Sequence, residues 1–148
     1  MAQRIAVGAD HAGFEYKEQA KKLLISLGYD VKDFGTSSPD STDYPDFAHT
    51  VALSVASGES AFGILVCGTG IGMAIVANKH EGIRAANVES VEAAKMARAH
   101  NNANILTFGS RLISWDTAAA AIKMFLATPF EGGRHQRRVD KIHSLTNL

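Results

Sequence analysis

The chain has 148 residues, of which 46% are hydrophobic and 20% are charged. That length and composition are typical of one globular domain, spanning residues 1–148, with a sizeable core. Fifteen basic residues balance fifteen acidic ones, so the overall charge gives no indication of nucleic acid or an anionic membrane as a partner.

Short apolar runs typical of β-strands occur five times along the chain. They cover residues 5–8, 29–34, 62–67, 83–88 and 105–108. Amphipathic segments between and after them predict helices at residues 14–27, 45–57, 73–78, 90–100 and 115–126. Ser90 suits an N-cap, and Pro45 suits the first turn of its helix. After Gly132-Gly133, the basic tail is expected to form a last short helix.

The alternation of strands with helices of 10–15 residues indicates βαβ units and a parallel sheet covered on both faces. We therefore expect a three-layer α/β/α sandwich with a five-stranded, parallel, Rossmann-like sheet. Ligands of such sheets bind beyond the carboxyl ends of the strands. The strand-end residues are therefore the first candidates for a site: Asp10, His11, Cys67 to Gly72, and Gly109 to Arg111.

Cys67 ends the third apolar run and opens a glycine-rich turn, Cys67-Gly68-Thr69-Gly70-Ile71-Gly72. Free backbone N–H groups and a helix N-terminus at such a junction favour a thiolate and stabilise an anion. A lone cysteine on a buried strand is also typical of a small core hydrophobe. Because the chain has one cysteine, an internal disulfide, a cysteine-based zinc site and a resolving thiol are excluded.

The turn does not match a standard nucleotide motif. Its glycines follow G-x-G-x-G, so the dinucleotide fingerprint G-x-G-x-x-G fails at the third glycine. Glu89, about 20 residues further on at the end of the next strand, is the one feature that keeps a weak nucleotide interpretation open. A P-loop would need Gly-Lys-Ser/Thr, which is absent, as are a His-Glu-x-x-His pattern and a carboxylate-rich metal loop. A thiolate acting as a general base would need no metal.

Two histidines and a tyrosine are further candidates. His100 ends the fourth helix before Asn101, where it suits either a helix C-terminus or a general acid/base. His11 follows the first strand and is better placed for a site. Tyr44 is predicted to contact the substrate from a lid, whereas an N-cap role and a first-turn proline account for its neighbours Asp43 and Pro45.

Several arginines add positive charge to this picture. Arg134 and Arg138 are four residues apart, so on a helix they share one face and could hold a phosphate between them. A solvated face is the alternative for such a tail, and Arg137 would point elsewhere. Arg111 follows the fifth strand. Together these cations predict a small phosphorylated metabolite as the substrate.

Six blocks of this sequence resemble the ribose-5-phosphate isomerase B family, in order and through nearly the whole chain. They are GADHAGF, TDYPDFA, ILVCGTGIGMAIVANK, GIRAA, ARAHNNANILTFGSR and FEGGRHQRRV. The resemblance implies an aldose–ketose isomerase that interconverts ribose 5-phosphate and ribulose 5-phosphate without a metal or other cofactor. It also implies a homodimer, or dimer of dimers, with shared active sites and the tail from about residue 130 on a partner subunit. The single cysteine and the lack of a long apolar stretch separately lead us to expect a cytoplasmic protein.

The same resemblance implies roles for individual residues. Cys67 would be the base that moves a proton between C1 and C2, with the enediolate held by Gly68, Thr69, Gly70, Ile71 and Gly72. His100 would open the furanose ring beside Asn101. The remaining contacts to the sugar or its phosphate would come from Asp10, His11, Arg111, Arg134 and Arg138. His100, Asn101 and the tail arginines of one subunit would face Cys67 of the other, while the roles of His135 and Arg137 stay open.

Two other functions remain alternatives at this point. One is an isomerase of a six-carbon sugar phosphate, allose 6-phosphate or galactose 6-phosphate, because one carbinol group separates these substrates from the five-carbon ones. The other is a non-catalytic module whose glycine turn only holds a phosphate. The sequence gives no indication of a nucleic-acid partner, and no stretch approaches the ~20 apolar residues of a membrane span.

Overall fold

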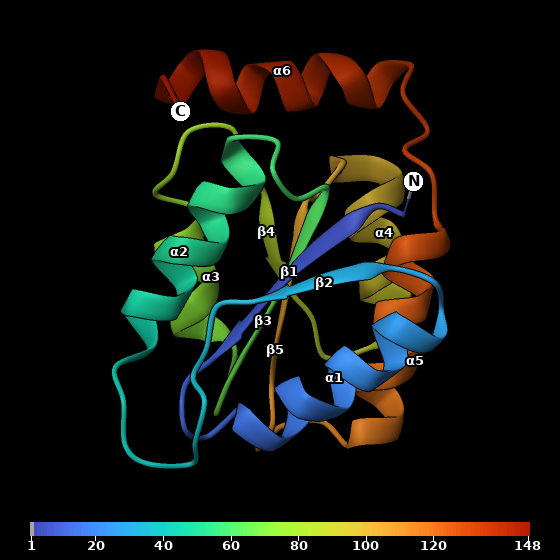
Figure 1. Cartoon of the computed structure of the whole chain (residues 1–148). Helices are drawn as coiled ribbons and strands as arrows, with labels where there is room; N and C mark the ends of the chain where they lie inside the picture. Colours follow the sequence, from blue (N-terminus) through green and yellow to red (C-terminus); the bar gives the residue numbers. More distant parts are fainter. Residues whose placement is uncertain (1) are drawn as a thin grey trace.

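The structure is a computed structural model that describes residues 2–148 (Figure 1). Its five parallel strands lie in the order β2-β1-β3-β5-β4. The strands are β1 (Arg4–Ala9), β2 (Asp30–Asp33), β3 (Phe62–Cys67), β4 (Ala85–Asn87) and β5 (Ile105–Gly109). The helices are α1 (Phe14–Ser26), α2 (Tyr44–Ala56), α3 (Ile71–Ala77), α4 (Val91–Asn101), α5 (Trp115–Ala127) and α6 (Arg134–Thr146).

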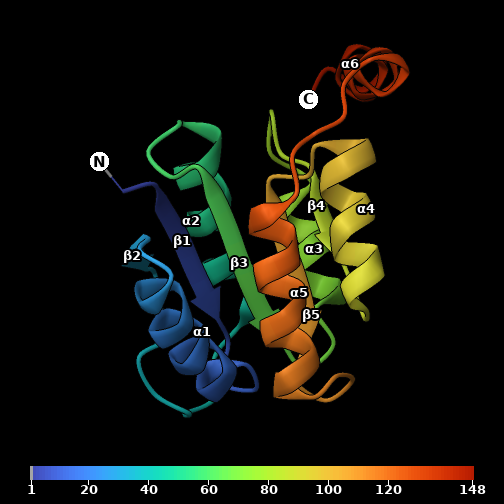
Figure 2. The same ribbon diagram turned by 90° about the vertical axis from the view of Figure 1, so that its right-hand side faces the viewer.

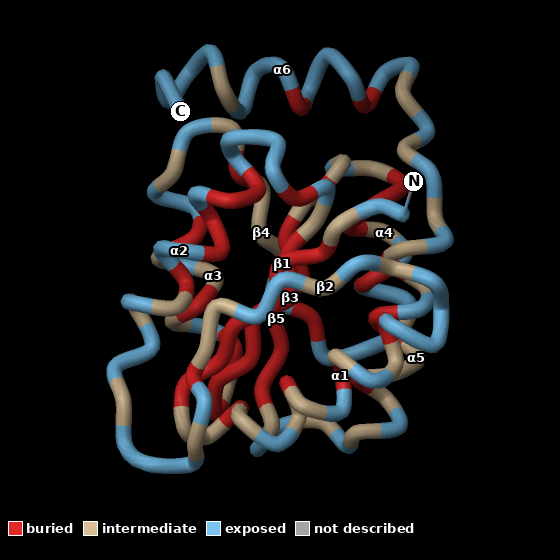
Figure 3. The backbone as a smooth tube through the Cα atoms, in the orientation of Figure 1, coloured by how far each residue is buried: buried red, intermediate tan, exposed pale blue. Residues whose placement is uncertain are grey.

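Helices cover both faces of the sheet, which confirms the predicted three-layer α/β/α fold. α1, α4 and α5 lie on one face and α2 and α3 on the other (Figures 1 and 2). Each interface has its own apolar cluster, one centred on Phe108 and Phe125 and the other on Val51 and Leu65. The buried segments accordingly concentrate in the strands at the centre of the molecule (Figure 3).

Most predicted elements agree with the observed ones to within one residue at each end, and three differ by more. α3 begins at Ile71 instead of Met73, so the glycine turn runs directly into the helix. β4 contains three residues, because the side chain of Asn78 bonds both N–H and C=O of Ala85 and Asn104 Oδ1 accepts the N–H of Arg84. The tail helix is not short: α6 has 13 residues.

The two edges of the parallel sheet face opposite ends of the molecule. β3 ends at Cys67 at the carboxyl edge, whereas α4 runs back from that edge and ends beside the start of β5. α6 crosses the amino edge, packs against α4 and projects beyond the rest of the chain (Figure 2). Gly82, before β4, donates its N–H to the carbonyl of Leu148 at 2.6 Å, which holds the end of the chain at this same edge.

A partly buried ion pair fixes the segment that leads from β2 toward α2. Lys17 of α1 is 1% exposed, and its Nζ lies 2.7 Å from Oδ2 of Asp33. Lys21 reaches the same oxygen at 2.7 Å, while Asp33 Oδ1 accepts the N–H of Gly35 at 2.8 Å. Burial alone would raise the pKa of Asp33, but these hydrogen bonds outweigh it and the pKa is lowered. Among residues 2–148, no helix has the length and hydropathy of a membrane span.

Candidate active site

Cys67 lies at the carboxyl end of β3, where its thiol is buried but borders a cavity. The backbone N–H of Gly70 donates to its Sγ at 3.0 Å. A fixed donor at this distance is arranged to stabilise negative charge on the sulfur. The strand end, the turn and the first turn of α3 thus place a nucleophilic atom and backbone dipoles together.

The glycine turn owes its shape to close approach between backbones. Gly70 has φ +79°, a conformation that L side chains rarely adopt, and a Cβ there would clash with the side chain of Asn87 and the backbone of Phe108. A Cβ on Gly109 would clash with Thr69 in the same way. These two glycines let the turn lie directly against the end of β5.

A cavity of about 420 Å³ opens in front of the thiol. It is lined by Asp10, Tyr44, Cys67, Gly68, Thr69, Ile71, Gly72, Ile75 and Arg111. The ring of Tyr44 packs so closely on Gly72 that a Cβ there would overlap it. Arg111 lies against Gly68, and its guanidinium forms no ion pair with any carboxylate of residues 2–148. The cavity therefore combines a thiol with an uncompensated cation.

Asp10 and His11, at the end of β1, form structural hydrogen bonds within the chain. Oδ1 of Asp10 accepts the N–H groups of Ala12 and Gly13 at 3.0 and 3.1 Å, which shapes the turn into α1. His11 exchanges two bonds with Thr42: its N–H donates to Thr42 Oγ1, and its Nδ1 accepts the N–H of Thr42, both at 3.2 Å. His11 thus anchors the loop before α2, and it does not line the cavity of Cys67.

The other predicted site residues lie at the amino edge of the sheet in the same chain. His100 and Asn101 end α4, while Arg134 and Arg138 occupy the first turns of α6. Asn101 lines a separate cavity of about 440 Å³ between α6 and the segment around β4. Within a single chain these residues therefore lie far from Cys67. They gather instead where the end of α4 meets the start of α6.

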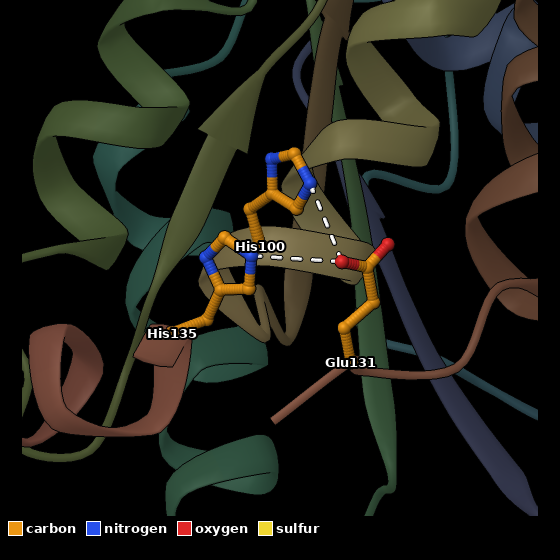
Figure 4. A group of neighbouring side chains, drawn as sticks. All are labelled: His100, Glu131 and His135. Atoms are coloured by element: carbon orange, nitrogen blue, oxygen red, sulfur yellow. Dashed lines mark ion pairs between the residues drawn. The ribbon is translucent and has the colours of Figure 1, made fainter. Parts of the chain in front are cut away.

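His100 belongs to a cluster with Glu131 and His135 (Figure 4). The two imidazole rings stack with their centroids 4.3 Å apart and their planes 11° from parallel. Oε1 of Glu131 lies 3.6 Å from Nε2 of His100 and 3.5 Å from Nε2 of His135. The pKa of His135 is lowered, first by burial and then by the positive charges of His100, Arg134 and Arg138. Glu131 alone raises it and does not offset the other effects.

This cluster has the residue types of a metal site but not its geometry. The ligating lone pair of an imidazole lies in the ring plane, and Zn–N bonds are about 2.0–2.1 Å. Two nearly parallel, stacked rings cannot direct both lone pairs at one ion without turning apart. The arrangement as it stands suits proton transfer better than metal binding.

Glu131 was missed by reasoning from the sequence, and His135 received no role there. The sequence feature that could have indicated them is their spacing of four residues, across Gly132 and Gly133, in the segment that connects α5 to α6. The spacing alone does not indicate His100 as a partner. The fold supplies that link, because the carbonyl of Ala99 accepts the N–H of Glu131 at 3.0 Å and so places Glu131 beside His100.

Comparisons with known proteins agree with the geometry. A model of the family described as Ribose/Galactose Isomerase matches residues 5–142. The chain is 45% identical to ribose-5-phosphate isomerase B of Escherichia coli over 143 residues, which cover 97% of this chain and 96% of the relative.

Solved structures give the same result. Ribose-5-phosphate isomerase B from Clostridium thermocellum superposes with a TM-score of 0.96 at 45% identity, covering 98% of both chains. The enzyme from Thermotoga maritima superposes with a TM-score of 0.94 at 50% identity, covering 97% of this chain and 99% of the other. With a family model over nearly its whole length and relatives this similar, the chain belongs to the ribose/galactose isomerase family.

Proposed function

We propose that this protein interconverts D-ribose 5-phosphate and D-ribulose 5-phosphate through an enediolate, with Cys67 as the base. The observation that carries the proposal is the 3.0 Å hydrogen bond from the Gly70 N–H to Cys67 Sγ in a cavity that also contains Arg111. The relatives named above, at 45–50% identity, support the same reaction.

The chemistry requires one base and donors for two oxygens. Cys67 would remove the proton from C2 of the open-chain aldose and return it to C1 of the enediolate. Among residues 2–148, the N–H groups of Thr69 and Gly72 make no hydrogen bond to the protein, which leaves them for the enediolate oxygens. Such preorganised donors stabilise charge that develops in the transition state. Arg111 would bind an anionic group of the substrate.

The site is complete only if two chains share it. Ring opening of the furanose needs a proton-transfer group, and in this proposal His100 supplies it with Asn101 beside it. Because both lie at the edge opposite Cys67, they would come from a second subunit, together with Arg134 and Arg138 as phosphate ligands. The exposed side chains of Ile71 and Ile75 on α3 and of Leu145 on α6 support such an association.

Turnover of purified protein on ribose 5-phosphate, allose 6-phosphate and galactose 6-phosphate tests the proposal. We expect the five-carbon substrate to give the highest kcat/KM, and Cys67→Ala to abolish exchange of the C2 proton with solvent while thermal unfolding stays within a few degrees of wild type. A preference for a six-carbon sugar would change the substrate but keep the reaction.

Two results would contradict the proposal. Full turnover by Cys67→Ala would exclude the thiol as the base. Binding of ribose 5-phosphate by the wild type without any turnover would indicate a phosphate-binding module instead of an enzyme. Ser41→Ala, an exposed serine in the loop before α2, is the matched control for a small substitution outside the cavity.

A further inference from the structure

The cluster of His100, Glu131 and His135 draws its members from three separate segments (Figure 4). His100 is in the last turn of α4, Glu131 lies in the connection from α5 to α6, and His135 is the second residue of α6. Backbone hydrogen bonds hold two of them: Glu131 N–H donates to Ala99 C=O, and His135 N–H donates to Gly132 C=O, both at 3.0 Å, while His100 is held by its helix. The side chains therefore meet on a fixed frame.

The carboxylate of Glu131 faces one of the two nitrogens of the His100 ring. A carboxylate oxygen only accepts hydrogen bonds, and Oε1 faces Nε2 of His100 at 3.6 Å. At 3.6 Å the contact is an ion pair and not a hydrogen bond; a small approach of the carboxylate would favour the neutral tautomer with its proton on Nε2 and a lone pair on Nδ1. Nδ1 of His100 makes no hydrogen bond with residues 2–148, and the His100 side chain is 39% exposed. With the proton on Nε2, Nδ1 would be a proton acceptor in this partly exposed ring.

His135 plays a different part in the same cluster. Its side chain is 11% exposed, its ring stacks on that of His100, and its Nε2 faces the same carboxylate oxygen at 3.5 Å. The groups that face it are Glu131, His100, Arg134 and Arg138; burial lowers its pKa and so does each of these except Glu131. A neutral His135 leaves the negative charge of Glu131 to compensate a proton on His100.

We propose that Glu131 and His135 are positioning residues for His100, with Glu131 keeping the proton on Nε2 and His135 holding the ring plane, so that Nδ1 transfers the proton. The inference rests on the proposed function, in which His100 opens the sugar ring. Without the carboxylate the ring would exchange between tautomers, and without the stacked ring it would turn about its side-chain bonds.

The proton transfer balances without any other reactant. Nδ1 takes the proton of the anomeric hydroxyl, and the electron pair of that O–H bond forms the C1 carbonyl. The bond from C1 to the ring oxygen breaks, and the ring oxygen takes its electron pair together with the proton from Nδ1–H. The imidazole ends in its starting form, and Glu131 stabilises the imidazolium that exists between the two transfers.

The kinetic test uses the full-length protein and ribose 5-phosphate carrying deuterium at C2. For Glu131→Gln we expect kcat/KM to fall about 10- to 100-fold, within the range of a positioned acid/base. We also expect the isotope effect on kcat/KM to fall toward 1, because ring opening then limits the rate before C2 loses its proton. Glu92→Gln, an exposed glutamate at the other end of α4, is the control and should match the wild type in both.

Two substitutions separate the stacking of the His135 ring from its ion-pair contact with Glu131. His135→Phe keeps an aromatic ring under His100 and should retain kcat/KM within about 3-fold, whereas His135→Ala removes the stack and should lower kcat/KM about 10-fold. Equal activity of the two variants would overturn the role of His135.

An independent readout is the ¹⁵N spectrum of the histidine rings at a pH where His100 is neutral. The wild type should show the proton of His100 on Nε2, and Glu131→Gln should show both tautomers. A wild-type proton on Nδ1, or unchanged kcat/KM in Glu131→Gln, would overturn the inference. If instead the wild type does not isomerise ribose 5-phosphate, the proposed function fails, while the spectrum still decides the tautomer.

Discussion

The carboxyl edge of the sheet and its amino edge are built in different ways. At the carboxyl edge, Cys67 and the glycine turn rely on backbones that approach so closely that a single Cβ at Gly70 or Gly109 would not fit. At the amino edge, His100, Glu131 and His135 are long side chains that meet from the end of one helix, a connection and the start of another. The first region is encoded as a local motif, and the second arises only from the fold.

Mixed dimers offer the largest test of this comparison, because the proposal assigns the two edges to one shared site. Cys67→Ala and His100→Ala should each be nearly inactive alone, yet co-expression should restore about one quarter of wild-type activity. Half of a random mixture is heterodimer, and one of the two sites in each heterodimer is then intact. Tagged, purified heterodimers, with one intact site out of two, should show about one half of wild-type activity.

The control for that experiment uses two residues of one edge. Cys67 and Arg111 line the same cavity of a single chain, so a heterodimer of Cys67→Ala with Arg111→Ala has no intact site and should stay inactive. Recovery in this control as well, or no recovery in the first pair, would contradict the sharing of sites between the two edges.

A smaller effect is expected from the packing at the carboxyl edge. Gly70→Ala combines a positive φ with a clash against Asn87 and Phe108, and it should lower the free energy of unfolding by about 2–4 kcal/mol. Gly58 has nearly the same φ, +82°, but nothing lies within 4 Å of its Cβ position. Gly58→Ala should therefore cost only about 1 kcal/mol, as urea denaturation would measure, and equal losses would show that close packing is not what Gly70 provides.

The smallest effect concerns pH and belongs to the amino edge. The folded chain lowers the pKa of His135 from its usual 6.5, so below about pH 6.5 the unfolded chain binds a proton that the folded chain resists. Stability should therefore decline as the pH falls through this window and be retained above it. Urea midpoints between pH 5.5 and 7.5 would show the slope, and His135→Phe should flatten it. An unchanged slope in that variant would assign the effect to other groups.

The contrast between the edges also explains which features could be predicted from the sequence. Hydrophobic patterning predicted the five strands and the five helices before the tail in their observed order, since each βαβ unit is local and strongly patterned. The predicted starts of α3 and β4 were each wrong by two residues. In each case the deciding contact comes from elsewhere in the chain: the end of β5 beneath Gly70, and the side chains of Asn78 and Asn104 at β4.

The site followed the same division. The strand-end rule led to Cys67, the glycine turn and Arg111, which the structure gathers around one cavity. It did not distinguish Asp10, which shapes a turn, from His11, which anchors Thr42. Glu131 could not be predicted because its partner His100 lies 31 positions earlier in the sequence. No local pattern links a glutamate before two glycines to the last turn of α4.

If the proposed site is shared between subunits, the opposite placement of the Cys67 cavity and the His100 cluster separates the folding of a chain from its activity. The hydrophobic clusters that stabilise each chain lie between the edges, so they form within a monomer and do not close the proposed site. Dilution should then abolish turnover at concentrations where circular dichroism still reports a folded chain. An enzyme arranged in this way would be switched off by subunit dissociation and would recover on concentration without having to refold.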